Sequence, residues 1–251
     1  MPLTCGSLES AGASGDGTLG GRDAPGCYGS RVNYLAHSLR FLDQPAVLVG
    51  ACLPDMLSAV DRKCRMRDRN VRPFLEDADP FTADIARGVL AHLDDDHWFH
   101  GTEAFLVTSS RLSKAIRATL PTDESHRVGF LGHILTEILL DRWLIGRDET
   151  LLDRFHSQLE TLDPAAIQDV VNRLATRPTE RIAEMYPRMI AERFLDDYPF
   201  DQKLLRRLNG IMKRVGLPKL PPEFAGELPE LFAIVERSAF TLLPPDVRDR
   251  V

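Results

Sequence analysis

The stretch Gly88-Val-Leu-Ala-His92-Leu-Asp-Asp-Asp96-His-Trp-Phe-His100 places imidazole and carboxylate groups at helical spacing among apolar residues. In an α-helix, His92 and Asp96 lie one turn apart on one face, and His100 continues that face by a further turn. Gly88, one turn before His92, removes a side chain and lets another backbone or a substrate approach. Imidazole and carboxylate on one rigid helix suit a divalent metal ion. The stretch therefore predicts a metal-binding helix, and a solvated acidic face is the alternative interpretation.

The rest of the chain from residue 32 onward also has apolar residues at helical spacing, and no two adjacent segments alternate as strands do. The Asp79-Pro80 pair predicts the start of the helix with His92, and Gly101 its end. The other predicted helices are Ala46–Val60, Leu106–Leu120, a long helix through Ile145, Leu151–Leu162, Ala165–Ala175, Thr179–Phe194, Phe200–Val215 and Leu228–Leu242. We expect an all-α fold, a single-domain multi-helix bundle over residues 32–245. Its motif-bearing core spans 32–145, and additional helices span 146–245.

Composition limits the function of the chain. With 31 basic and 37 acidic residues the net charge is −6, which argues against a general nucleic-acid binder. No apolar run is long enough to span a bilayer, and residues 1–31 lack the apolar core of a secretory signal. The four cysteines show no C-x-x-C spacing, as expected of reduced thiols in a cytoplasmic protein. Residues 1–31 are dominated by Gly, Ser and Ala, so we expect them to be disordered.

A second helix repeats the combination of ionisable and apolar residues. In Gly132-His133-Ile-Leu-Thr-Glu137-Ile-Leu-Leu-Asp141 the three ionisable residues fall within an arc of roughly 80°. Their neighbours are almost all apolar, and burying three such groups without partners is costly. A metal ion is one such partner.

Taken together, six residues on predicted helices are candidate ligands of one metal centre: His37, Asp55, His92, Asp96, His133 and Glu137. Asp95, Asp141 and Asn33 are expected to be reserve ligands or to orient the ligands. This mixed set of imidazoles and carboxylates suits Mn²⁺, Fe²⁺ or Zn²⁺. Such an ion lowers the pKa of a bound water, and Asp55 or Asp96 is the expected catalytic carboxylate that orients that water.

The motifs Asn33-Tyr-Leu-Ala-His37, Gly50-Ala-Cys-Leu-Pro-Asp55, Gly88 to Asp96, and the later His133 resemble the acyl carrier protein phosphodiesterase family. The resemblance covers roughly residues 32–145. It implies an all-helical, divergent HD-type metal phosphohydrolase that releases phosphopantetheine from the carrier protein. Two positions depart from the family. Gly132 stands where the family has an acid, and Glu137 stands where the family has none. The adjacent His-Asp dyad of ordinary HD proteins is also absent.

The start of the same family pattern bears on the N-terminal segment. The family has its initiator methionine directly before the asparagine, and Val32 holds that place here. We therefore expect translation to begin at Val32, and residues 1–31 to contribute nothing to the fold or the site.

Two other interpretations remain open. The successive H-x-x-x-D and H-x-x-x-E pairs resemble the zinc-dependent phospholipase C and single-strand nuclease group, which is also all-helical. That group begins with a metal-binding tryptophan, which has no counterpart here. The other interpretation is a helical binding protein with a degenerate, metal-free site.

The segment Asp61–Arg72 has an excess of four positive charges, six basic residues against two acidic ones. Most such runs are solvated surfaces. Because this one follows Asp55, we expect it to bind substrate, either a phosphate or an acidic acyl carrier protein. Its candidate residues are Arg62, Lys63, Arg65, Arg67 and Arg69.

Overall fold

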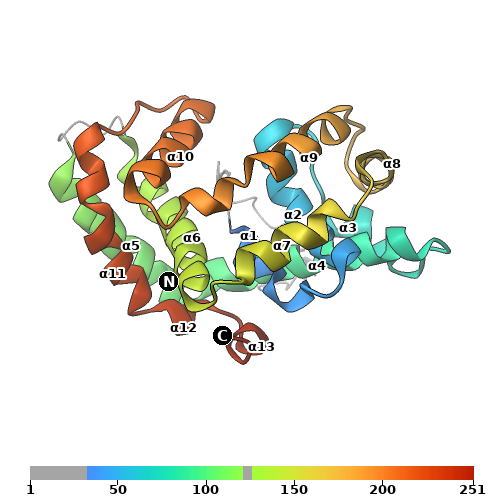
Figure 1. Ribbon diagram of the computed structural model, residues 1–251, viewed down its shortest axis with the longest axis horizontal. Coiled ribbons are helices and arrows are strands. Elements are labelled where there is room, and N and C mark those ends of the chain that lie inside the picture. Colours follow the sequence, from blue (N-terminus) through green and yellow to red (C-terminus); the bar gives the residue numbers. More distant parts are fainter. Residues whose placement is uncertain (1–32, 121–125) are drawn as a thin grey trace, which may run out of the picture.

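The structure is a computed structural model that describes residues 33–120 and 126–251 (Figure 1). Within these ranges every regular element is a helix, which confirms the predicted all-α fold. The expectations for residues 1–31, and for translation from Val32, lie outside the described residues. The α-helices are α1 (Tyr34–Ser38), α2 (Pro45–Val60), α3 (Asp68–Val71), α4 (Pro80–Gly101), α5 (Glu103–Thr119), α6 (Val128–Arg147), α7 (Leu151–Glu160), α8 (Pro164–Leu174), α9 (Arg181–Glu192), α10 (Asp201–Arg214), α11 (Leu228–Glu236), α12 (Ala239–Leu242) and α13 (Pro245–Arg248).

Most helix ends lie within a few residues of the predicted ones, and capping side chains mark the starts of α4, α5 and α8. Asp79 caps α4: its carboxylate accepts hydrogen bonds from the backbone N–H groups of Phe81 and Thr82, and Pro80 is the first helical residue. The helix predicted over residues 228–242 is instead two helices, α11 and α12, separated by Arg237 and Ser238. Short 3₁₀ helices join several elements: η1 (Leu39–Phe41), η2 (Arg72–Glu76), η4 (Phe194–Asp197) and η5 (Pro222–Gly226).

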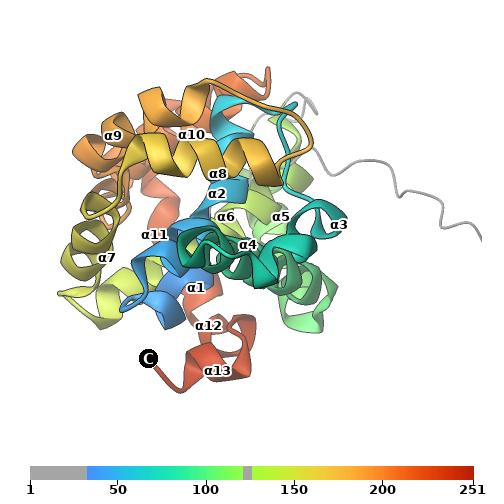
Figure 2. The same cartoon turned by 90° about the vertical axis from the view of Figure 1, so that its right-hand side faces the viewer.

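Helix α1 lies near the middle of the molecule and contacts α2, α4 and α6 (Figures 1 and 2). Figure 1 shows α5, α6 and α11 on one side of α1, and α2, α4, α8 and α9 on the other. At the C-terminal end, α13 packs against η1 and buries Val247. Among the described helices, none has both the length and the apolar content required to cross a membrane.

Two glycines bring α2 and α4 unusually close together. A Cβ atom on Gly88 would overlap the carbonyl oxygen of Val47, and one on Gly50 would overlap that of Ile85. The prediction that Gly88 permits a close approach is therefore confirmed, and the approaching group is the backbone of α2. This contact sets the backbone of α2 directly against the face of α4 that carries His92.

Gly132 likewise brings α5 and α6 close together. A Cβ atom on Gly132 would overlap the hydroxyl oxygen of Ser113 and the carbonyl oxygen of Ser109, both on α5. A side chain of any size at position 132 would push the two helices apart. This packing explains why position 132 here has no acid, although the family that the motifs resemble has one.

Candidate metal centre

Helix α4 carries candidate ligands at two levels. Its residues His92 and His100 are eight positions apart, which is about 12 Å along a helix axis. Asp96 lies midway between them. The side chain of His37 on α1 meets α4 at the level of His92 and Asp96, and that of Glu137 on α6 meets α4 at His100. One helix thus links two groups of possible ligands.

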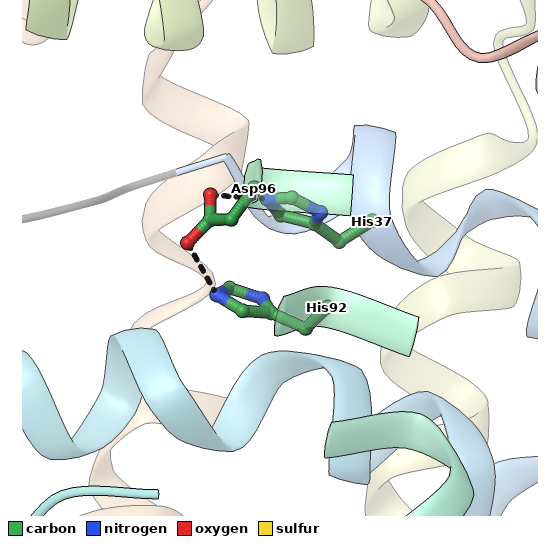
Figure 3. A group of neighbouring side chains, drawn as sticks. All are labelled: His37, His92 and Asp96. Atoms are coloured by element: carbon green, nitrogen blue, oxygen red, sulfur yellow. Dashed lines mark ion pairs between the residues drawn. The ribbon is translucent and has the colours of Figure 1, made fainter. Parts of the chain in front are cut away.

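The first group consists of His37, His92 and Asp96 and is called the buried group below. All three side chains are buried, and one ligand atom of each lies within 4.8 Å of the others. Figure 3 shows the Asp96 carboxylate beside the two neighbouring rings, with one oxygen directed at each. Its Oδ1 is 3.6 Å from Nε2 of His37, and its Oδ2 is 3.4 Å from Nε2 of His92.

Both imidazoles of the buried group are oriented by their other nitrogen. Nδ1 of His92 lies 2.8 Å from the carbonyl oxygen of Ala51 on α2, so it is the N–H donor. Nδ1 of His37 lies 3.3 Å from Asp95 Oδ2 and donates to it. This assignment, made from the hydrogen-bond partners, leaves a lone pair on each Nε2 that faces Asp96. Burial, together with the nearby His92, lowers the pKa of His37, which favours the neutral imidazole that binds metals.

Asp95 contacts the ring of the candidate ligand His37, where it would orient that ring if His37 binds a metal. Besides accepting from His37, its Oδ2 accepts a hydrogen bond of 2.5 Å from Arg40, on η1. Arg40 also donates to Asp246 on α13, at 2.9 Å. A carboxylate behind a histidine is a common arrangement around metal ions, because it fixes the ring and makes Nε2 more basic. The C-terminal helix thus reaches the buried group through Arg40.

Three other predicted residues surround the buried group. Asp55 is 1% exposed, and its Oδ1 is 3.9 Å from Nε2 of His92. Asp55 is not one of the three residues of the buried group. Asp141 caps α1 instead of facing a metal: its carboxylate accepts hydrogen bonds of 3.1–3.2 Å from the backbone N–H groups of Leu35 and Ala36. Asn33 is buried at the start of α1. Asp141 therefore positions the short helix that presents His37.

The second group consists of His100, His133 and Glu137 and is called the half-exposed group below. Oε1 of Glu137 is 3.1 Å from Nε2 of His100 and 3.1 Å from Nε2 of His133. Each imidazole is 22% exposed, whereas the Glu137 side chain is 2% exposed. Burial by itself raises the pKa of Glu137, but the two histidines outweigh this effect and hold the pKa at about 2, below the ordinary 4.5.

The structure corrects the prediction of one six-ligand centre. His133 and Glu137 lie in the half-exposed group, because α6 meets α4 one turn beyond Asp96 rather than at His92. His100 belongs to that group and was missing from the predicted ligand set. The sequence does indicate it, because His100 follows Asp96 by four residues, just as Asp96 follows His92 by four. Arg40 was also missed, since nothing in its local sequence indicates a contact with Asp95.

The basic segment that follows α2 makes contacts with the C-terminal half of the chain. Arg62 donates to the carbonyl oxygen of Arg214 at 2.7 Å, and the Arg65 side chain donates to the carbonyl oxygen of Arg62 at 3.2 Å. Five basic side chains of the segment are exposed: Arg62, Lys63, Arg65, Arg67 and Arg69.

Comparisons with family models, with curated proteins and with solved structures find no match to this chain. Its function must therefore be inferred from its own residues. The described part of the chain brings together two imidazoles whose Nδ1 atoms are hydrogen-bonded, and carboxylates that are costly to bury. Both are properties of a site for a divalent metal ion.

Proposed function

We propose that the protein is a metal-dependent hydrolase of phosphodiester bonds, and that the buried group holds its ion. The observation that supports this proposal is the orientation of the two imidazoles. His37 and His92 each have Nδ1 engaged and Nε2 directed at Asp96, which is how histidines are held around metal ions. An ion pair with a purely structural role does not require two imidazoles whose Nε2 atoms both face the same carboxylate.

The donor set fits Mn²⁺, Fe²⁺ or Zn²⁺, which accept mixed imidazole and carboxylate ligands. Such an ion supplies a water of lowered pKa and a positive charge for the phosphoryl oxygens. The protein residues do the rest. Asp96 would contribute negative charge next to both Nε2 atoms, and Asp55, 3.9 Å from Nε2 of His92, would orient a water and accept its proton. Asp95 and Arg40 keep the His37 ring in place.

For the substrate we propose the phosphodiester of an acyl carrier protein, from which phosphopantetheine would be released. This follows the resemblance of the motifs around Asn33, Asp55, His92 and His133. An acidic carrier protein would dock on the exposed basic segment after α2, where opposite charges speed encounter. A cytoplasmic location, where carrier proteins are modified, is part of the same proposal.

The proposal is tested by metal analysis and by hydrolysis of bis(p-nitrophenyl) phosphate and of a holo-acyl carrier protein. The wild-type protein, purified without chelator, should contain a transition metal and cleave the diester. His92→Ala should lose the diester cleavage and the ion of the buried group. Asp94→Ala is the matched control, because Asp94 is exposed on the same helix turn and should change neither. Metal-free wild-type protein that does not bind added Mn²⁺, Fe²⁺ or Zn²⁺ would contradict the proposal.

Two other functions each have one observation in their favour. The contact between His133 and Glu137 supports the zinc-dependent phospholipase C and nuclease alternative, which predicts cleavage of phosphatidylcholine or single-stranded DNA in the same assay. The contacts of Glu137 with His100 and His133 support a metal-free binding protein, in which these contacts are structural. That function predicts no metal and no hydrolysis, with full stability.

A further inference from the structure

The half-exposed group has the ligand set of a metal site in its own right. His133 and Glu137 are one turn apart on α6, and His100 reaches them from the end of α4. One ligand atom from each lies within 4.8 Å of the other two. Two imidazoles and one glutamate are a common protein ligand set of catalytic zinc ions, which keep one further position open.

Packing holds the two rings of this group side by side. The His100 and His133 rings are stacked, with centroids 4.7 Å apart and planes inclined by 20°. Phe105, a buried residue of α5, presents its ring edgewise to both, with centroids 4.8 Å and 4.9 Å away. Because Phe105 restricts both rings, their Nε2 atoms stay directed at the same oxygen of Glu137.

Solvent reaches the two imidazoles, and this separates the half-exposed group from the buried one. Each of His100 and His133 is 22% exposed, so an ion there has room for a water or for an oxygen of an incoming phosphate. The buried carboxylate of Glu137 supplies the negative charge. Imidazole-rich sets of this kind favour Zn²⁺ and similar ions over Mg²⁺ or Ca²⁺.

His100 connects the two groups. While its Nε2 faces Glu137, its Nδ1 lies 3.9 Å from Oδ1 of Asp96, the carboxylate shared by the rings of the buried group. Asp96 thus lies on the Nδ1 side of His100, as Asp95 does for His37, although the Asp96 contact is longer than a hydrogen bond. A charge at one group therefore acts electrostatically on the other group.

We propose that His100, His133 and Glu137 bind a second divalent cation of the Zn²⁺ class, which stays open to solvent and exchanges with it. This site uses none of the three ligands of the buried group, and goes beyond the proposed function. It stands or falls separately from the buried ion.

Cobalt titration tests the second site without any enzyme assay. Co²⁺ added to chelator-treated protein is followed by equilibrium dialysis and by its visible absorption, which reports tetrahedral coordination. Wild-type protein should bind two equivalents. His133→Ala and Glu137→Gln should each bind one, as should His37→Ala. The control is His97→Ala, an exposed residue on the same helix α4, which should still bind two equivalents. Circular dichroism checks that each variant keeps its helices.

The outcomes separate the two sites. Suppose that the wild type binds one equivalent, that His37→Ala loses it, and that both His133→Ala and Glu137→Gln keep it. This result overturns the second site and leaves the proposed function intact. One equivalent lost in His133→Ala but kept in His37→Ala supports the second site and removes the ion from the buried group. No binding at all overturns both. Glu137→Gln keeps the shape of the side chain, so a folding defect in His133→Ala does not decide the result.

Discussion

The buried and half-exposed groups contain nearly the same chemistry, two imidazoles and one carboxylate, in different surroundings. In the buried group, each ring is fixed by a hydrogen bond from Nδ1, to Ala51 or to Asp95. In the half-exposed group, the two rings are held mainly by stacking on each other and by contact with the Phe105 ring. Hydrogen bonds fix the tautomer as well as the ring position, whereas packing fixes the position alone. Under the two proposals, we therefore expect the ion of the buried group to be held permanently and that of the half-exposed group to exchange.

Asp96→Ala should have the largest effect, because Asp96 faces the rings of both groups. Loss of the buried ion removes several kcal/mol of charge stabilisation, and about 4 kcal/mol corresponds to about a 10³-fold loss of diester hydrolysis. Co²⁺ binding should weaken at both groups. Stopped assays with bis(p-nitrophenyl) phosphate and Co²⁺ dialysis measure the two effects. If Asp96→Ala lost no more than the exposed control Asp94→Ala, the buried group would not be the site of catalysis.

Gly88→Ala should come next, since its new methyl group would overlap the backbone of α2. Overpacking of a well-packed core typically costs about 1–3 kcal/mol, and occasionally more. The strain should disturb the buried group first, because α2 supplies the Ala51 carbonyl that orients His92. Gly132→Ala should be similarly costly but should disturb the half-exposed group instead. Urea denaturation measures the loss of stability, and Co²⁺ binding shows which group is affected.

The matched control for both glycine variants is Gly129→Ala. Gly129 lies on α6, and a Cβ atom there would meet nothing within 4 Å. Alanine is favoured over glycine inside helices by about 0.5–1 kcal/mol, so this variant should be slightly more stable than the wild type. If Gly88→Ala were as stable as Gly129→Ala, the close approach of α2 and α4 would be wrong.

Asp95→Asn should weaken metal binding at the buried group alone. Removing a partner behind a metal-binding histidine typically reduces metal affinity about 10–100-fold. Asparagine keeps the shape of Asp95 but loses the charge that pairs with His37 and Arg40. Competition with a chromophoric chelator measures the affinity of each equivalent. An equal loss at both groups would show that Asp95 acts on the whole fold and not on His37.

Reversing the charges of Arg65, Arg67 and Arg69 to Glu should have the smallest and most selective effect. These exposed side chains influence the encounter with an acidic protein, and salt screens that influence. We expect the KM for a holo-carrier protein to rise several-fold at low salt, and the kinetics with the small diester to stay unchanged. An equal loss on both substrates would mean that the arginines contact the reacting phosphate or hold the fold.

Much of the fold can be predicted from the sequence, because helix periodicity and capping are local properties. The Asp79-Pro80 start of α4, its end at Gly101 and the burial of α2 all depend on residues close together in the chain. The four-residue spacings on α4 and α6 likewise show which ionisable residues share a face.

The division of those residues between two groups was decided by tertiary structure alone. It depends on where α1 and α6 cross α4, and these crossings are set by contacts between residues far apart in sequence, such as the hydrogen bonds of Asp141 with the start of α1. Nor does any local pattern indicate that Ala51 offers its carbonyl to His92, or that Arg40 holds Asp95. Periodicity specifies the face of a helix to which a side chain belongs, whereas only the packing of the helices specifies what that face meets.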